Sequence, residues 1–296
     1  MNLIDILQMS KEEARAYLEK LHWPNGPMCP RCNGQNVLLL KGKSTRPGLY
    51  KCRPCSRQFT VTVGTIFEDG HVPLNKWLGA FYLMCSSKKG MSANQLSRDL
   101  GVAYKTAWYM CHRIRLAMRS KSLDKLKGVV EVDETYIGGK SSYKDRARKK
   151  TPVVALVQRG GRVKTSLMPQ VTARNVEYYM SRNIDENSMV ITDQAKWYKK
   201  PGKKFIMHKA VNHSKGEYVR GPIYTNTVES FFSLMKRGLY GTFHHVSVRH
   251  LTRYVEEFEF RWNNNGLKAS EIMDVAIKGS EGRRLTFREH SLGKLK

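Results

Sequence analysis

Acidic residues are scarce in this chain of 296 residues, which holds 25 Asp and Glu against 52 Lys and Arg, for a formal net charge of +27. This excess of positive charge favours a polyanionic partner, most simply nucleic acid. A ribosome-like or merely basic soluble protein is the alternative. The chain, however, is long enough to bury a core in two or three domains, and it carries motifs of its own.

Long apolar runs are absent as well. No stretch approaches the roughly 20 apolar residues of a membrane span, and residues 1–7 lack the basic start and apolar core of a secretory signal. We therefore expect a cytoplasmic protein that does not enter a membrane. Cysteines number only six, and in a reducing compartment they are typical of metal sites or protein cores rather than of disulfides.

Four of the six cysteines form two close pairs, Cys29 with Cys32 and Cys52 with Cys55, and nineteen residues separate the pairs. This spacing is typical of a zinc ribbon, in which two short turns supply four thiolates to one tetrahedral zinc ion. Two disulfides or a redox pair are the alternatives, and we favour zinc because so small a module needs the metal to fold. The ribbon is predicted over residues 23–68. The basic residues that it would present to DNA include Arg31, Arg53 and Arg57.

Helical patterns flank this module on both sides. Residues 1–22 have the pattern of an N-terminal amphipathic helix, with Ser10 and Glu13 spaced as in a capping box. Residues 72–125 have the pattern of a helix-turn-helix-like segment, in which Gly101 permits the turn. The helix after this turn would offer its N-terminal end to a DNA major groove, although any three-helix domain gives a similar pattern. The residues at that end are Tyr104, Lys105 and Thr106.

Three acidic residues further along the chain stand in unlike surroundings. Asp133 lies in the apolar run of residues 129–133, and Asp193 ends a second run at residues 189–193. Glu229 lies in a segment with a helical pattern. Because a carboxylate at the end of a buried strand is costly unless something neutralises it, these side chains predict one pocket that holds divalent metal. In so basic a chain, the natural substrate of that pocket is a phosphodiester.

The elements around these acids follow the order of an RNase H-like fold. Residues 128–277 are predicted to form a strand, a hairpin, a crossover helix, a further strand and late helices. We therefore expect a multidomain protein of α+β and α/β character, with a mixed sheet flanked by helices in its catalytic domain. Glu131 and Glu134 are interpreted as structural or supporting residues on the strand face opposite Asp133. A solvated basic tail is predicted over residues 278–296.

The predicted pocket suits two-metal chemistry. Magnesium prefers oxygen ligands and takes few carboxylates beside substrate phosphates, and manganese serves similarly. Two such ions about 4 Å apart suit in-line phosphoryl transfer, since one activates the attacking oxygen and the other stabilises the leaving oxygen. Lys236 lies about two helical turns after Glu229 and could hold a phosphate beside the ions. Asn226, three residues before Glu229, shares the same helix face.

Several of these features also have plainer interpretations. Asp193 could merely cap the helix that follows it, and Glu229 could be a surface residue of its helix. The basic loop of residues 140–150 is interpreted as a contact with the DNA backbone, the alternative being a solvated turn. Cys85 and Cys111 lie in helical patterns and are interpreted as buried apolar residues. No two histidines have a convincing metal-ligand spacing, so we favour packing or DNA contact for them. They include His208, His213, His244, His245 and His250.

Long contiguous motifs make the chain similar to a known family. They are the two cysteine pairs and the segments 132–139, 191–193, 211–219, 225–247 and 253–263. On these motifs the sequence resembles, over nearly the whole chain, the DDE transposases of bacterial insertion sequences that carry an N-terminal zinc ribbon. This is the ISXO2-like family, which is related to the Merlin transposons. Motifs of such length are specific.

The resemblance implies that Asp133 and Asp193 are the two catalytic aspartates. The third place is described with Glu in some branches of the family and with Asn in others, so Glu229 fits the first description and Asn226 the second. We choose Glu229 as the third magnesium ligand because a carboxylate neutralises metal charge better than an amide does.

The resemblance further implies that the ribbon and the helix-turn-helix bind the terminal inverted repeats of an insertion sequence. A 3′ hydroxyl freed at the element's end would then attack target DNA, in the cytoplasm of a bacterium and at its nucleoid. Because two ends must be joined, we expect a homodimer or larger assembly on double-stranded DNA. Two alternatives are a non-catalytic zinc-ribbon DNA-binding protein derived from a transposase and an RNase H-like nuclease that cuts without joining.

Overall fold

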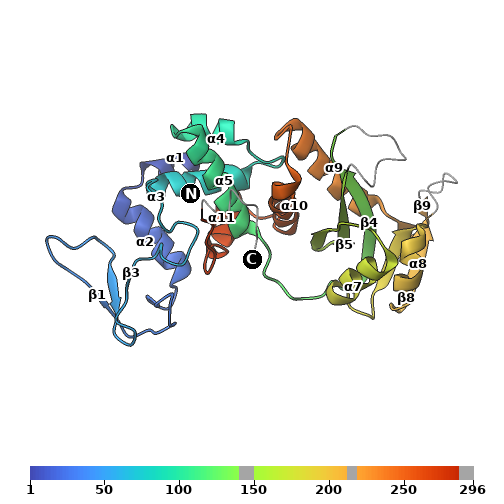
Figure 1. The fold of residues 1–296 in the computed structure, drawn as a ribbon, viewed down its shortest axis with the longest axis horizontal. Coiled ribbons are helices and arrows are strands. Elements are labelled where there is room, and N and C mark those ends of the chain that lie inside the picture. Colours follow the sequence, from blue (N-terminus) through green and yellow to red (C-terminus); the bar gives the residue numbers. More distant parts are fainter. Residues whose placement is uncertain (140–149, 212–218, 287–296) are drawn as a thin grey trace. The chain divides into compact units, whose positions relative to one another are not determined.

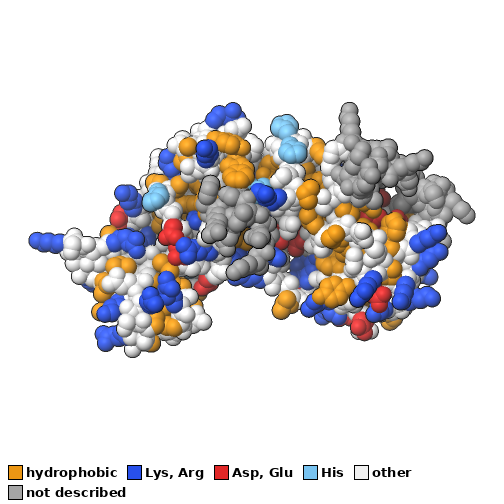
Figure 2. All heavy atoms as spheres, in the orientation of Figure 1, with side chains coloured by type: hydrophobic (Ala, Val, Ile, Leu, Met, Phe, Trp, Pro, Cys, Tyr) orange, Lys and Arg blue, Asp and Glu red, His pale blue; other side chains and the backbone are white. Residues whose placement is uncertain are grey.

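The computed structural model describes residues 1–139, 150–211 and 219–286. His213 and the predicted basic loop, apart from Lys150, lie outside these ranges. No helix within them has both the length and the apolarity needed to cross a bilayer. On the face drawn in Figure 2, Lys and Arg side chains far outnumber Asp and Glu, in agreement with the net charge of +27.

The chain divides into two compact units (Figure 1). Unit 1 consists of Met1–Ser120 together with Gly266–Lys296, and unit 2 is the single stretch Lys121–Asn265. The cysteine module and the predicted helix-turn-helix belong to unit 1, whereas the three acidic residues belong to unit 2.

Unit 1 is built around helix α3, Leu74–Ser86, which packs against α1, α2, α4, α5 and α11. Gly79 lets α3 approach its neighbours closely, because a Cβ atom there would lie 2.7 Å from Cδ2 of Leu7 and 3.4 Å from Cδ2 of Leu100. Trp77 and Phe81 of α3 are buried in this core. The other helices are α1 (Leu3–Gln8), α2 (Lys11–His22), α4 (Ala93–Leu100), α5 (Tyr104–Met118) and α11 (Ala269–Lys278).

The N-terminal segment forms two helices, whereas the sequence predicts one. Each helix begins with its own capping box, Asn2 with Asp5 for α1 and Ser10 with Glu13 for α2. Both reciprocal pairs satisfy backbone N–H groups that a helix start leaves without partners. The capping box at Ser10 that the sequence predicts is therefore present, and a second one at Asn2 starts the additional helix.

The turn that the sequence predicts between α4 and α5 is formed at Gly101, whose φ of +58° is the left-handed conformation that glycine adopts easily. Leu96 and Leu100 of α4 are buried, as are Ala107 and Cys111 of α5. Tyr104 and Lys105, at the start of α5, are exposed. The segment thus has the helix-turn-helix-like arrangement expected from its pattern.

The cysteine module forms a small antiparallel sheet in the order β1-β2-β3. Its apolar core is slight and consists mainly of three aromatic rings: Trp23, at the end of α2, meets Tyr50 edge-on at 5.4 Å and Phe59 at 5.8 Å between ring centroids. So small a core agrees with a module held together by metal. The strands are β1 (Val37–Leu39), β2 (Tyr50–Cys52) and β3 (Gln58–Phe59).

The C-terminal stretch differs from its prediction. Helix α11 packs against α2, α3 and α5 of unit 1, although the sequence analysis includes it in the catalytic domain. The solvated tail predicted from Lys278 is wrong for the residues that directly follow α11. Ser280 and Leu285 are buried, and the Arg283 guanidinium donates hydrogen bonds to the carbonyl oxygens of Leu116 and Ala117. Two buried residues and a run of backbone carbonyls thus hold this stretch against α5.

Unit 2 contains a five-stranded sheet in the order β6-β5-β4-β7-β8. Strands β4, β7 and β8 are parallel, and β5 runs antiparallel to both β4 and β6. This mixed sheet confirms the predicted RNase H-like arrangement. The strands are β4 (Val129–Ile137), β5 (Thr151–Gln158), β6 (Val163–Leu167), β7 (Met189–Asp193) and β8 (Met207–Val211).

Helices cover the sheet on both faces (Figure 1). One face packs Val130, Val132 and their neighbours against α7 and α8, and the other packs residues such as Ile137 and Ala155 against α9 and α10. A short hairpin, β9 and β10, leads into α9. These elements are α7 (Ala173–Asn183), α8 (Lys196–Gly202), β9 (Val219–Arg220), β10 (Ile223–Tyr224), α9 (Asn226–Gly241) and α10 (Val248–Asn263).

Candidate active site

The two aspartates lie on adjacent parallel strands at the centre of the sheet. The register of β4 and β7 pairs Val132 with Thr192, so the next residues on the two strands are Asp133 and Asp193. Because paired residues on neighbouring strands point to the same face, both carboxylates lie on the face that α9 covers. Both side chains are half-buried.

Helix α9 brings Glu229 to the same region of unit 2. Glu229 lies in its first turn and is exposed, and its Oε1 accepts a hydrogen bond of 3.3 Å from the Thr225 hydroxyl. Asn226, the first residue of α9, is also exposed, and Lys236 is half-buried two turns further on. All three sequence-predicted residues of this helix are thus carried by one continuous element.

Electrostatics link the three carboxylates. Burial raises the pKa of Asp133 well above its ordinary value, and the neighbouring charges of Glu134, Asp193 and Glu229 raise it further. A backbone N–H bond from Glu134 to Oδ1, at 2.8 Å, acts in the opposite direction but is outweighed. The site therefore concentrates negative charge that a bound cation would relieve.

The plainer interpretation of Asp193 also has a counterpart in the structure. Its Oδ1 accepts a hydrogen bond of 3.0 Å from the backbone N–H of Ala195, directly ahead of α8. This bond fixes the carboxylate at the end of β7 and does not move it to the other face of the sheet. One oxygen of Asp193 thus helps to start the turn into α8 while the residue keeps its place beside Asp133.

A buried carboxylate that the sequence analysis misplaces lies next to these acids. Glu131 is fully buried and, being two residues before Asp133 on β4, lies on the same face. The interpretation that alternation turns Glu131 to the opposite face is wrong. Its carboxylate accepts hydrogen bonds from the backbone N–H groups of Thr227 at 2.8 Å and Val228 at 3.0 Å. Glu131 therefore caps the N-terminus of α9 from within the sheet.

Arg159, at the end of β5, completes this connection. Its Nε lies 2.6 Å from Oε1 of Glu131, and its two terminal nitrogens donate to the carbonyl oxygens of Pro222 at 2.7 Å and Tyr224 at 2.8 Å. The guanidinium also stacks 3.6 Å above the Tyr224 ring. One ion pair thus joins β4, β5, the β9–β10 hairpin and the start of α9. Counting residues along β4 would have placed Glu131 on the same face as Asp133, because side chains two positions apart on a strand share a face.

Glu134 lies on the other face of β4, as predicted. It accepts hydrogen bonds from the Tyr198 hydroxyl at 2.5 Å and from Nε1 of Trp197 at 3.4 Å. Burial raises the pKa of Tyr198 well above its ordinary value, and the charge of Glu134 adds to this shift. The interpretation of Glu134 as a supporting residue agrees with these contacts, which hold α8 to the sheet.

An open hollow of about 640 Å³ adjoins Asp193 on the side of α8 and β8. Lys199 and Lys203 contribute positive charge to its lining. His208 also lines it; burial lowers the pKa of this histidine, and its Nε2 lies 3.0 Å from the Thr192 hydroxyl. His208 thus packs against β7, whereas the sequence analysis left packing and DNA contact open for it, and the two lysines place positive charge near Asp193.

The four cysteines of unit 1 form a compact cluster. The Sγ atoms of Cys29 and Cys55 are 3.7 Å apart, those of Cys32 and Cys52 are 3.5 Å apart, and all four lie within 4.8 Å of one another. Zinc–sulfur bonds of about 2.3 Å in a tetrahedron require sulfur atoms roughly 3.8 Å apart, so the cluster fits one zinc ion. Across the described ranges, no other group of three or more Cys, His, Asp or Glu side chains converges this closely.

The two cysteine pairs are held by matching turns. Asn33 follows the first pair and Ser56 the second, and both adopt a left-handed backbone with φ of 57°. The backbone N–H of Arg57 lowers the pKa of the Cys55 thiol to about 7, which favours the thiolate that zinc binds. Cys85 and Cys111 are buried in helices, as predicted.

The residues predicted to contact DNA all lie in unit 1. Arg31, Arg53 and Arg57 are exposed on the zinc ribbon. On α5, Tyr104 has 51% of its surface exposed, and Thr106 is half-buried. The structure brings the acidic set together in unit 2 and leaves these basic and polar side chains accessible in unit 1.

Comparisons with known proteins give a match for the acidic site in unit 2 and another for the zinc ribbon in unit 1. Residues 125–263 match the family model of the ISXO2-like transposase domain, and residues 9–58 match that of the transposase zinc-ribbon domain. The chain is 30% identical over 272 residues to an uncharacterised protein in the transposable element ISH50 of Halobacterium salinarum, covering 86% of this chain and 91% of that protein.

A second relative is an uncharacterised transposase-like protein of Haemophilus influenzae, 27% identical over 120 residues, covering 40% of this chain and 96% of that protein. The zinc-ribbon match and the cysteine cluster together indicate zinc, and the two matching domains imply DNA binding. The mixed sheet, the cysteine cluster, the two domain matches and the relative that spans most of the chain lead to one conclusion: the chain belongs to the ISXO2-like transposases of insertion sequences and carries their zinc ribbon.

Proposed function

We propose that this protein is a DDE transposase that cuts DNA at the ends of its insertion sequence and joins them to target DNA. The observation that carries the proposal is that Asp133 and Asp193 are neighbours on central parallel strands. Glu229, on α9, is close enough that its charge raises the pKa of Asp133. Membership of the ISXO2-like transposases makes DNA phosphodiesters the substrate class.

Magnesium or manganese fits this donor set, because all three side chains are carboxylates and Asp133 resists ionisation without a neighbouring cation. Asp133, Asp193 and Glu229 would hold the ions. When bound, such ions activate an attacking oxygen and neutralise charge at a leaving oxygen.

The chain's own residues orient the DNA strand. Lys236, on the same helix as Glu229, binds a phosphate oxygen next to the scissile bond, and its positive charge stabilises charge that develops there. Asn226 is the alternative third ligand, since it lies three residues before Glu229 and is equally exposed. We favour Glu229 because its charge raises the pKa of Asp133.

The reaction has two steps. Water first breaks the phosphodiester at the element's end and leaves a 3′ hydroxyl. That hydroxyl then attacks a target phosphodiester, so that one P–O bond forms as another breaks and no covalent protein–DNA intermediate is needed. The zinc ribbon and α5 bind the terminal inverted repeats, and a dimer or larger assembly holds two ends together.

A strand-transfer assay tests this function. Precut element-end DNA is incubated with supercoiled target plasmid and magnesium, with wild type beside Asp193→Asn, Glu229→Gln and Asn226→Ala. We expect joined products from wild type and none from the Asp193 variant. Loss with Glu229→Gln, but not with Asn226→Ala, would assign the third ligand to Glu229, and the reverse pattern would assign it to Asn226.

Two outcomes would overturn the proposal. Hydrolysed ends that are never joined would indicate an RNase H-like nuclease. DNA binding that is equal in all four proteins, without cutting or joining, would indicate a non-catalytic DNA-binding protein. Zinc content and the unfolding midpoint of each variant serve as the check that its fold is unchanged.

A further inference from the structure

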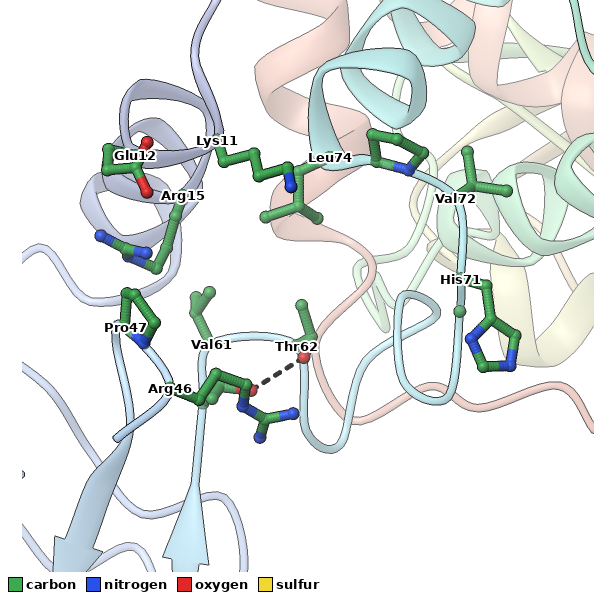
Figure 3. A pocket seen from close by; sticks show the side chains of 13 residues that line it. Lys11, Glu12, Arg15, Arg46, Pro47, Val61, Thr62, His71, Val72 and Leu74 are labelled. Carbon is green, nitrogen blue, oxygen red and sulfur yellow. Dashed lines mark hydrogen bonds between the residues drawn. The ribbon is translucent and has the colours of Figure 1, made fainter. Parts of the chain in front are cut away.

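Two hollows in unit 1 share a turn. The first, of about 450 Å³, lies between α2, the zinc ribbon and residues 70–74 (Figure 3). The second, of about 530 Å³, lies between the same turn, α3 and the start of α5. Both are lined by the turn residues Gly70, His71, Val72 and Pro73. The two hollows therefore adjoin at this turn, one of them bordering the ribbon and the other the start of α5.

Positive side chains from distant parts of the sequence line both hollows. In the first, Figure 3 shows Lys11 of α2, Arg46 of the loop between β1 and β2, and His71 of the turn around the open space. In the second, Lys76 of α3 and Lys105 of α5 continue the series. None of these five side chains forms an ion pair within the residues that the structure describes. The positive charge of the three Lys and one Arg among them is therefore available to a ligand.

Little negative charge opposes these cations. Asp69 lines the second hollow, but it is paired with Arg284. Glu12 lies at the first hollow and is exposed. Lys76 makes only a contact of 3.4 Å with the carbonyl oxygen of Gly101. The lining of each hollow thus carries a net positive charge.

Neutral hydrogen-bond donors add to this lining. Thr62 lies in the first hollow, where its hydroxyl is 2.9 Å from that of Thr60. At the second hollow, the N-cap residue of α5, Ala103, makes no side-chain capping bond, so no side chain caps the N–H groups of the first turn. Trp77, only 2% exposed, has an Nε1–H without a partner at the same hollow.

We infer that the two hollows form one groove for the phosphate backbone of duplex DNA, so that the zinc ribbon and α5 bind a single continuous stretch of an element end. Lys and Arg side chains that form no ion pair are the chemistry that recognises successive phosphates, and the Trp77 Nε1–H adds a neutral donor. The inference rests on the proposed function and assigns Lys11, Arg46, His71 and Lys76 to phosphate contact.

The test is the salt dependence of DNA binding. Full-length wild type, Lys11→Gln, Arg46→Gln and Lys105→Gln are titrated, without magnesium, into a fluorescein-labelled duplex of mixed sequence over a range of salt concentrations. Each lost phosphate contact should reduce the slope of log K against log[salt] by about 0.9. Lys20→Gln is the matched control, because Lys20 is exposed on the same helix as Lys11 and lines neither hollow.

Reduced slopes in the three groove variants, with the Lys20 variant like wild type, would support the groove. Slopes equal to that of Lys20→Gln in all three variants would overturn it, as would tighter binding of an acidic peptide than of DNA. The readout is separate from catalysis: wild type that binds and joins DNA while the groove variants keep its slope disproves the groove alone. Reduced slopes in a protein that never joins DNA disprove the proposed function alone.

Discussion

At the scale of single residues, Asp133 is where burial and negative charge act together. Its folded-state pKa is raised above the value of about 4 that an unfolded chain has. An acid with a raised folded pKa destabilises the fold increasingly as pH rises from the unfolded value through the folded one. A divalent ion bound at the neighbouring carboxylates, as we propose, would remove this penalty.

We expect Asp133→Asn to have a higher Tm than wild type at neutral pH without magnesium, and the difference to vanish below about pH 4, where the wild-type carboxyl is protonated in both states. Magnesium should raise the wild-type Tm by about 2–4 °C for each kcal/mol by which the bound ion stabilises the folded state. It should raise the Tm of Asp133→Asn by less. Asp124→Asn is a control of opposite sign, because Ser122 and Arg162 lower the pKa of Asp124. Identical melting of wild type and Asp133→Asn at every pH would contradict this view.

The acidic residues were predictable one by one because each interrupts an apolar or helical pattern. Their partners were not. Whether Glu131 shares a face with Asp133 follows from counting along β4, and the miscount hid its role. That its carboxylate meets Thr227 nearly a hundred residues later depends on how α9 docks on the sheet, which no local pattern of the sequence contains.

At the scale of elements, the start of α9 is held by an ion pair rather than by a cap of its own: no side-chain cap is present at Thr225. The pair is fully buried at Glu131 and 19% exposed at Arg159. Removing one member of a buried pair leaves an uncompensated charge. This ion pair therefore adds to the apolar packing that aligns the strand carrying Asp133 with the helix carrying Glu229.

Glu131→Ala should accordingly lower the free energy of unfolding of unit 2 by about 3–5 kcal/mol, whereas Glu131→Gln, which can still accept the two backbone hydrogen bonds, should cost less. Urea unfolding measures both. Glu177→Gln is the control, since its ion pair with Lys204 is partly exposed and should contribute little to stability. A cost for Glu131→Ala no larger than that of the control would show that α9 is held by apolar packing alone.

Most elements were predictable from local pattern. The strands β4 and β7, the helix α7 and the turn at Gly101 lie where apolar alternation, helical periodicity and glycine indicate them. The break between α1 and α2 was not, because the sequence analysis recognised the capping box at Ser10 but not the one at Asn2. A second helix start within a short amphipathic stretch leaves little periodicity by which to detect it.

At the scale of the whole molecule, folding requires metal only at the zinc ribbon of unit 1, because unit 2 has large apolar clusters of its own. We expect Cys55→Ser to lose zinc and bind DNA weakly, because the ribbon has too small a core to fold alone. The unfolding midpoint of unit 2 should stay unchanged. Zinc content, DNA-binding titration and urea unfolding measure these effects. Cys85→Ala is the control that should retain zinc, and full zinc in Cys55→Ser would contradict the four-cysteine site.

The assignment of α11 shows where prediction from sequence ends at this scale. Its amphipathic pattern predicts a helix but does not identify the core on which that helix packs. Contacts with α2, α3 and α5, and the bond from His22 to the carbonyl oxygen of Ile277, are made with residues more than a hundred positions earlier. The packing of α11 in the folded protein shows that it is the last helix of unit 1 and not of unit 2.

Because α11 and the residues after it complete unit 1, the catalytic unit is inserted within the unit that carries the zinc ribbon. A ribosome making this protein must therefore synthesise all of unit 2 before the core around α3 can close. A chain cut short after Asn265, the last residue of unit 2, would keep Asp133, Asp193 and Glu229 and still lack α11 from the core of unit 1. Loss of α11 would thus impair the unit that carries the zinc ribbon while leaving the acidic residues in place.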